Sequence, residues 1–152
     1  MPSQQILAAI PHRPPFLLVD EVVEQTAERI VCRKTFTGDE FWFQGHYPDY
    51  PLTPGVLLCE AAMQAGAVLL SEITKAAQAG DVPDGVPVAT RLNNVQFRQF
   101  VRPGDTIEIA VDLTEQLSNA YFMKGRVTVA GKLAVRCEFA CTVAPRPAAN
   151  DQ

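Results

Sequence analysis

Two residues of this chain have the types and the spacing that acid/base chemistry requires. His46, one of only two histidines, lies in the run Gly-His-Tyr-Pro, fourteen residues before Glu60. A neutral imidazole can accept a proton near pH 7, and burial of a carboxyl group raises its pKa so that it can act as an acid. The pair predicts a site in which a histidine takes one proton and a glutamate supplies another.

The glutamate stands in a segment that is apolar nearly all round. Residues 56–70 read Val-Leu-Leu-Cys-Glu-Ala-Ala-Met-Gln-Ala-Gly-Ala-Val-Leu-Leu and contain a single ionisable acid, Glu60. A helix that is apolar on every side is buried. We therefore expect a core helix that begins at Gly55, with Thr53 as its N-cap, and runs to about residue 79. A structural ion pair between Glu60 and an arginine is the alternative to an acid role.

The rest of the chain reads mainly as strands. Strands followed by one long buried helix and then by more strands predict an α+β domain, whose antiparallel sheet covers a single helix. The length fits one domain over residues 1–145 with a loose tail at 146–152. We expect a short helix at 3–10, an aromatic-rich stretch at 40–44, and strands at 16–23, 29–36, 88–101, 106–115, 120–130 and 132–143.

Composition excludes several classes of protein. The formal charge of −4 and the pI near 5.1 argue against a nucleic-acid partner. The apolar segment is shorter than the roughly 20 residues needed to span a bilayer, and we find no secretion signal, so we expect no membrane span and a cytoplasmic protein. The cysteines have neither zinc-site spacing nor the density of a disulfide scaffold, so we expect no metal, and we interpret Cys59 as core filler.

Four blocks of residues occur in a characteristic order. They are residues 11–20 (Pro-His-Arg-Pro-Pro-Phe-Leu-Leu-Val-Asp), residues 45–48 (Gly-His-Tyr-Pro), residues 54–57 (Pro-Gly-Val-Leu) leading to Glu60 and Gln64, and residues 95–105 with Val-Gln-Phe-Arg and Val-Arg-Pro-Gly-Asp. Together they resemble the bacterial 3-hydroxyacyl-[acyl-carrier-protein] dehydratases of fatty-acid synthesis. The resemblance covers about residues 4–143 and implies the hot-dog fold, an antiparallel sheet wrapped around one long central helix.

The resemblance also implies roles for individual residues. His46 matches the base that takes the α-proton of a (3R)-hydroxyacyl thioester, and Glu60 matches the acid that helps the 3-hydroxyl leave as water, giving a trans-2-enoyl thioester. Gly55 matches a glycine whose backbone N–H holds the thioester oxygen. Gln64 lies one turn beyond Glu60 and is placed to orient the carboxyl. The family needs no metal or organic cofactor, and glutamate rather than aspartate at the acid position favours a dehydratase without isomerase activity.

Partners follow from the same resemblance. Family members form homodimers, in which the histidine of one subunit meets the acid of the other, and dimers often assemble into trimers of dimers. The acidic acyl-carrier protein docks on basic residues beside the substrate tunnel, and Arg98 and Arg102 are our first choices. The tunnel must hold an acyl chain, so we expect apolar walls from Val56, Leu57, Leu58 and Phe97.

Some positions depart from the family pattern. Asp49, Tyr50, Thr53, Gln99, Phe100 and residues 88–91 differ from the usual residues, which leaves chain-length preference open. His12 stands between prolines and is interpreted as a packing residue rather than a catalytic one, and Phe16, Leu17 and Leu18 as core. Two alternative functions remain at this stage: a hot-dog acyl thioesterase, or a non-catalytic module that binds acyl chains or carrier protein.

Overall fold

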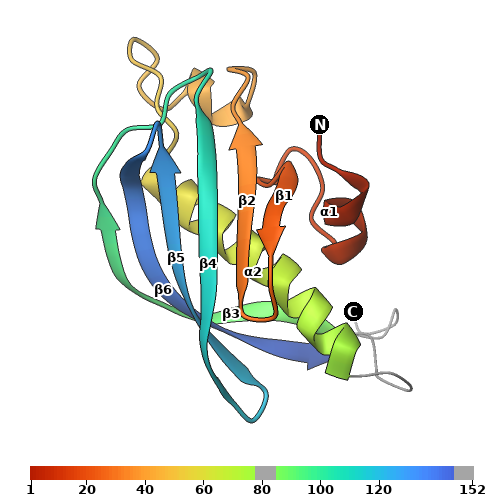
Figure 1. Ribbon diagram of the computed structural model, residues 1–152. Helices are drawn as coiled ribbons and strands as arrows, with labels where there is room; N and C mark the ends of the chain where they lie inside the picture. Colours follow the sequence, from red (N-terminus) through yellow and green to blue (C-terminus); the bar gives the residue numbers. More distant parts are fainter. Residues whose placement is uncertain (78–84, 146–152) are drawn as a thin grey trace, which may run out of the picture.

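Six antiparallel strands form one sheet that curves around a long helix (Figure 1). The computed structural model describes residues 1–77 and 85–145. The helices are α1 (Gln4–Ala9), the 3-10 helix η1 (Phe41–Gln44) and α2 (Gly55–Ala77), and the strands are β1 (Glu21–Gln25), β2 (Arg29–Thr35), β3 (Gly85–Phe97), β4 (Thr106–Leu117), β5 (Ala120–Val129) and β6 (Lys132–Pro145). The predicted tail at 146–152 lies outside the described residues.

The sheet has the strand order β1-β2-β4-β5-β6-β3, with every neighbouring pair antiparallel. Tight turns join β4 to β5 and β5 to β6, with positive φ at Ser118 in the first and at Ala130 and Gly131 in the second. Helix α2 contacts strands β2 to β6, while α1 lies beside β1 and α2 (Figure 1). The predicted α+β architecture is confirmed.

Two glycines allow close contact between helix α2 and the sheet. A Cβ added at Gly125 of β5 would lie 2.9 Å from the Cβ of Ala62, and one added at Gly66 would lie 2.8 Å from the sulfur of Met123. A larger side chain at either position would displace the helix or its neighbours. Close packing fixes the helix, and with it the direction in which Glu60 and Gln64 point.

Helix α2 is also long enough and apolar enough to span a membrane. Its Gly55–Lys75 segment has a mean hydropathy of 1.6, but 61% of the apolar window is buried inside the protein. The core helix of a water-soluble protein passes the same test, because the sheet provides the apolar surroundings that lipid would provide in a membrane.

The predicted strand at 16–23 is wrong over its first half. The backbone N–H groups of Phe16 and Leu17 donate to Arg13 O in a turn, and Leu18 N–H donates to the side chain of Gln64 at 2.7 Å. These donors are therefore not available for a strand ladder, and β1 begins only at Glu21. Leu17 and Leu18 are core residues as predicted, whereas Phe16 is 47% exposed.

Strand boundaries also differ from the prediction, and other expected features gain detail. Residues 41–44 form a 3-10 helix, and β3 ends at Phe97 instead of residue 101. Thr53 precedes α2 as expected, but its hydroxyl accepts a hydrogen bond from Trp42 Nε1 at 3.2 Å. That contact ties the segment before the helix to η1, which carries the chain into His46. The predicted helix end near residue 79 falls outside the described residues.

Candidate active site

His46 is held by backbone contacts at both its main chain and its ring. It lies just beyond Gly45, the C-cap of η1, and its N–H donates to Trp42 O at 2.9 Å. Its ring Nδ1 lies 2.9 Å from Leu52 O. A carbonyl oxygen can only accept, so Nδ1 carries the hydrogen, and Nε2 of the neutral ring keeps a free lone pair. The arrangement gives His46 the tautomer that a base needs.

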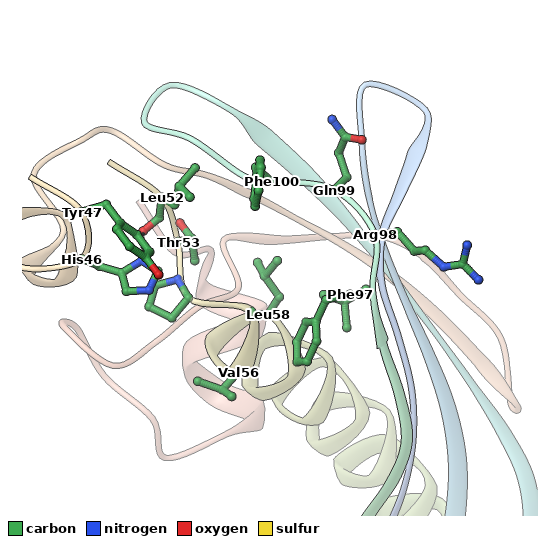
Figure 2. Close-up of a pocket in the computed structure, with 13 residues that line it drawn as sticks. His46, Tyr47, Leu52, Thr53, Val56, Leu58, Phe97, Arg98, Gln99 and Phe100 are labelled. Carbon is green, nitrogen blue, oxygen red and sulfur yellow. Dashed lines mark hydrogen bonds between the residues drawn. The ribbon is translucent and has the colours of Figure 1, made fainter. Parts of the chain in front are cut away.

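The histidine lines a cavity of about 710 Å³ at the N-terminal end of α2. Val56, Leu58 and Phe97 also line it, as predicted for the tunnel. Figure 2 shows His46 and Tyr47 on one side of the cavity and Phe97 on the other, with Arg98 pointing away from its centre. The size and the largely apolar lining suit an acyl chain or another slender apolar ligand.

Gly55 places the first turn of α2 against this cavity. The first N–H groups of a helix have no intrahelical partner and attract negative charge. A Cβ built on Gly55 would overlap the ring of Phe97. Glycine is therefore required here for close approach, and the helix end and the Phe97 ring are neighbours in one cavity wall.

Glu60 lies elsewhere, against a second cavity of about 70 Å³ whose lining includes His12, Gln64 and Cys141. Its side chain is 23% exposed, so the expected buried carboxyl is only partly buried. This part of α2 faces a gap between the N-terminal segment and β3. Among the described residues no arginine pairs with Glu60, which removes the structural ion-pair reading for that part of the chain.

Gln64 connects Glu60 to the N-terminal segment. Its amide nitrogen donates to Phe16 O at 2.9 Å and to Glu60 Oε1 at 3.2 Å, and its oxygen accepts from Leu18 N–H. The side chain is 1% exposed. Each polar atom of the buried amide is thus used, which fixes its orientation. The predicted contact with the carboxyl is present.

The two cavities have no lining residue in common. Within one chain, His46 and Gly55 stand at the larger cavity, while Glu60 and Gln64 stand at the smaller one. Spacing alone did not predict this separation, although the family resemblance implied a site shared between two subunits. One other expectation is wrong: Leu57 packs toward the core instead of lining the larger cavity. The guanidinium of Arg102 stacks on the ring of Tyr50, 4.7 Å from its centroid.

Two contributors to the site were not predicted. Leu52 contacts the His46 ring through its backbone carbonyl. Every residue has a backbone carbonyl, so the residue type at position 52 cannot indicate this contact. His12 lies with Nε2 3.9 Å from Glu60 Oε1, although it precedes Glu60 by nearly fifty residues.

In the described ranges, 1–77 and 85–145, no group of three or more potential metal ligands occurs.

Comparison with known proteins shows to which family the chain belongs. A family model described as a FabA-like domain matches residues 10–138. The 3-hydroxyacyl-[acyl-carrier-protein] dehydratase FabZ of Koribacter versatilis (strain Ellin345) is 40% identical over 141 residues, covering 91% of this chain and 86% of the relative. The chain belongs to the 3-hydroxyacyl-[acyl-carrier-protein] dehydratase family. Another dehydratase of this name, from Syntrophotalea carbinolica, is 38% identical over 142 residues, 93% of each chain.

Solved structures agree with the fold of the dehydratase family. A chain of the dehydratase heterocomplex ApeI:P from Xenorhabdus doucetiae matches with a TM-score of 0.76 at 17% identity, covering 93% of this chain and 91% of that one. A hypothetical thioesterase with coenzyme A from Streptococcus pneumoniae TIGR4 matches with a TM-score of 0.63 at 12% identity, covering 95% and 94%. Likeness at these identities concerns the fold alone, and it confirms the predicted hot-dog fold.

Proposed function

We propose that this protein is a (3R)-hydroxyacyl-[acyl-carrier-protein] dehydratase of fatty-acid synthesis, with His46 as base and Glu60 as acid. Family membership supports the reaction class, a hydro-lyase. The observation that carries the assignment of the base is the 2.9 Å contact between His46 Nδ1 and Leu52 O, because it leaves Nε2 of this cavity-lining ring without a hydrogen.

The proposed reaction needs three groups acting together. Nε2 of His46 takes a proton from C2 of the substrate, and negative charge develops on the thioester oxygen. The N–H of Gly55, at the start of α2, stabilises that charge. Glu60 gives its proton to the 3-hydroxyl, the C3–O bond breaks, and water leaves as the C2=C3 double bond forms. Each proton transfer is typically worth roughly 10²–10⁴-fold in rate.

A second copy of the chain would complete this site. His46 and Glu60 of one chain line different cavities, so a catalytic pair needs a glutamate from elsewhere. Strand β3 stands at one edge of the sheet and carries exposed apolar side chains, Val88 and Leu92 among them. An open apolar edge is suited to pairing with another strand. These features support a homodimer, and further assembly into trimers of dimers is compatible with it.

Carrier-protein docking is the other part of the proposal. Arg98 borders the larger cavity and its side chain points away from the centre (Figure 2). A cation at that position can steer an acidic carrier protein toward the cavity mouth in the cytoplasm. Arg102, held against Tyr50, offers a more rigid charge nearby. Arg98→Glu should raise the KM for a carrier-bound substrate and leave the KM for a small synthetic thioester unchanged.

Hydration of a trans-2-enoyl thioester, the reverse reaction, tests the function. Loss of enoyl absorbance and release of free thiol are followed in the same samples of native protein, His46→Ala and Glu60→Gln. Glu72→Gln is the matched control, since Glu72 is an exposed carboxyl on the same helix. We expect hydration in the native protein and in Glu72→Gln, loss in the other two, and no thiol release. An inert native protein, or thiol release that neither substitution changes, would overturn the proposal.

A further inference from the structure

One histidine lies beside Glu60 without a role in the mechanism described above. His12 Nε2 is 3.9 Å from Glu60 Oε1, and the two side chains border the cavity of about 70 Å³. The imidazole stacks on Phe16 with ring centroids 6.4 Å apart and an interplanar angle of 19°. The imidazole thus lies roughly parallel to the Phe16 ring, with Nε2 as the ring atom nearest the carboxyl.

The other ring nitrogen indicates which tautomer His12 adopts. Nδ1 is buried and has no hydrogen-bond partner among the described residues. A buried N–H without an acceptor is costly, as is a buried charge, so the ring is most stable with a lone pair on Nδ1 and its hydrogen on Nε2. Burial also lowers the pKa of His12, against the opposing effect of Glu60. Neutral His12 thus presents a donor to Glu60.

The neighbouring charges agree with a neutral imidazole. The guanidinium of Arg13 is directed at backbone carbonyls, those of Leu7, Ile10 and His12 itself, and it too lowers the pKa of His12. Cys141 of β6 borders the same cavity, and burial raises the pKa of its thiol to about 11. It is therefore uncharged at neutral pH. Glu60 is the group that His12 faces directly.

The Gln64 amide and the His12 ring both lie on the Oε1 side of the Glu60 carboxyl. Gln64 Nε2 donates to Oε1, and His12 Nε2 is also nearest to Oε1. At 3.9 Å the histidine is beyond direct hydrogen-bond distance, but the adjoining cavity has room for a bridging water, whose share of liquid volume is roughly 30 Å³. A carboxylic acid has one oxygen that only accepts and one that carries the proton. Two donors on Oε1 leave the proton on Oε2.

We propose that His12 is a positioning residue of the dehydratase, whose Nε2–H acts with the Gln64 amide to hold Glu60 so that Oε2 delivers the proton to the substrate hydroxyl. This inference rests on the proposed function of Glu60 as the acid. It assigns His12 no contact with substrate. Loss of its N–H should lower kcat by about 10-fold, part of the 10²–10⁴-fold that a general acid contributes, and change KM little.

Two substitutions separate the donor from the packing of the ring. His12→Gln keeps an N–H near the position of Nε2, whereas His12→Phe keeps the stack on Phe16 and removes the donor. We expect a kcat within about 3-fold of native for His12→Gln and a loss of about 10-fold in kcat for His12→Phe, because only the second variant lacks the donor. KM should be unchanged in both variants, and their urea midpoints should be close to each other. Equal kcat in the two variants would overturn the inference.

A spectroscopic measurement tests the tautomer without turnover. The chain has two histidines, so ring ¹⁵N signals at pH 8 can be assigned by comparison with His46→Ala. We expect His12 protonated at Nε2 and His46 at Nδ1. A His12 hydrogen on Nδ1 would overturn the inference even if the native enzyme is active. A native protein inert toward enoyl thioester would overturn the proposed function, and with it the role of His12 in turnover.

Discussion

The ring of Phe97 occupies the space in which any side chain of residue 55 would begin, so Gly55 and Phe97 form one wall of the larger cavity. One lies at the first turn of α2 and the other at the end of β3. The contact between Gly55 and Phe97 sets the distance between the start of α2 and the Phe97 ring. The thioester is proposed to bind at this wall of the cavity.

Gly55→Ala should therefore impair turnover more than folding. The new methyl group displaces the Phe97 ring into the cavity, and we expect kcat/KM to fall by about 100-fold, of the size seen on loss of one oxyanion donor. Gly45→Ala, whose Cβ would meet nothing within 4 Å, is the stability control. Adding Phe97→Leu to Gly55→Ala should recover part of the activity. No recovery in the double variant would show that the overlap with Phe97 is not the cause.

Gln64→Leu tests the amide that joins α2 to the N-terminal segment. It leaves the Leu18 N–H and the Phe16 carbonyl without their partner, and each unsatisfied buried group costs about 1–3 kcal/mol. We expect a lower free energy of unfolding in urea, by about 2–4 kcal/mol, and a reduced kcat. Gln116→Leu is the control, since Gln116 lies on the exposed end of β4. An unchanged unfolding free energy would contradict the buried network.

The sequence predicted the fold better than it predicted the site. The helix was evident because residues 56–70 are apolar on every side, and the later strands because turn residues separate them. The strand at 16–23 failed because Gln64, from a distant part of the chain, takes the Leu18 donor that a ladder would use. Residue patterns record local periodicity, and they do not record a side chain that arrives through tertiary packing.

The chemistry of the site was predicted in part for the same reason. Residue types and family resemblance selected His46, Glu60, Gly55 and Gln64, but the division of these residues between two cavities depends on tertiary packing. The contact between His46 and Leu52 O is made by a backbone atom, which any residue provides. Neither feature has a signal in residue type or spacing.

Complementation between inactive variants tests the shared site. If His46 of one subunit works with Glu60 of the other, a mixed dimer of His46→Ala and Glu60→Gln contains one intact site. Random exchange of equal amounts should restore about one-quarter of native activity, since half of the dimers are mixed. The measurement is enoyl hydration before and after co-refolding. Activity that stays at the level of the separate variants would show that both residues act within one subunit.

The depressed pKa of His12 gives a pH-dependent stability with a defined sign. Burial lowers the folded-state pKa below the unfolded value of 6.5, so the unfolded chain binds more protons between the two values. The contribution of His12 to the free energy of unfolding is therefore constant above the unfolded pKa. It decreases as pH falls from the unfolded pKa to the folded pKa, and it is constant again below the folded pKa. As the pH is lowered from 8 to 5, the thermal midpoint should fall less steeply in His12→Gln than in native protein. Parallel curves would contradict the shift.

All four cysteines should be unreactive in the native protein. Each is buried as a free thiol, and burial raises the pKa of Cys32 to about 12 and that of Cys141 to about 11. The contact between Cys59 and Cys137 lowers the pKa of the Cys59 thiol and raises that of Cys137, so Cys59 is protected by its burial alone. Because the thiolate is the nucleophile, both burial and protonation suppress alkylation. Iodoacetamide at pH 8 should modify no cysteine in folded protein and four in urea, counted by intact mass, and a single fast-reacting thiol in the native state would show that one of these side chains is accessible.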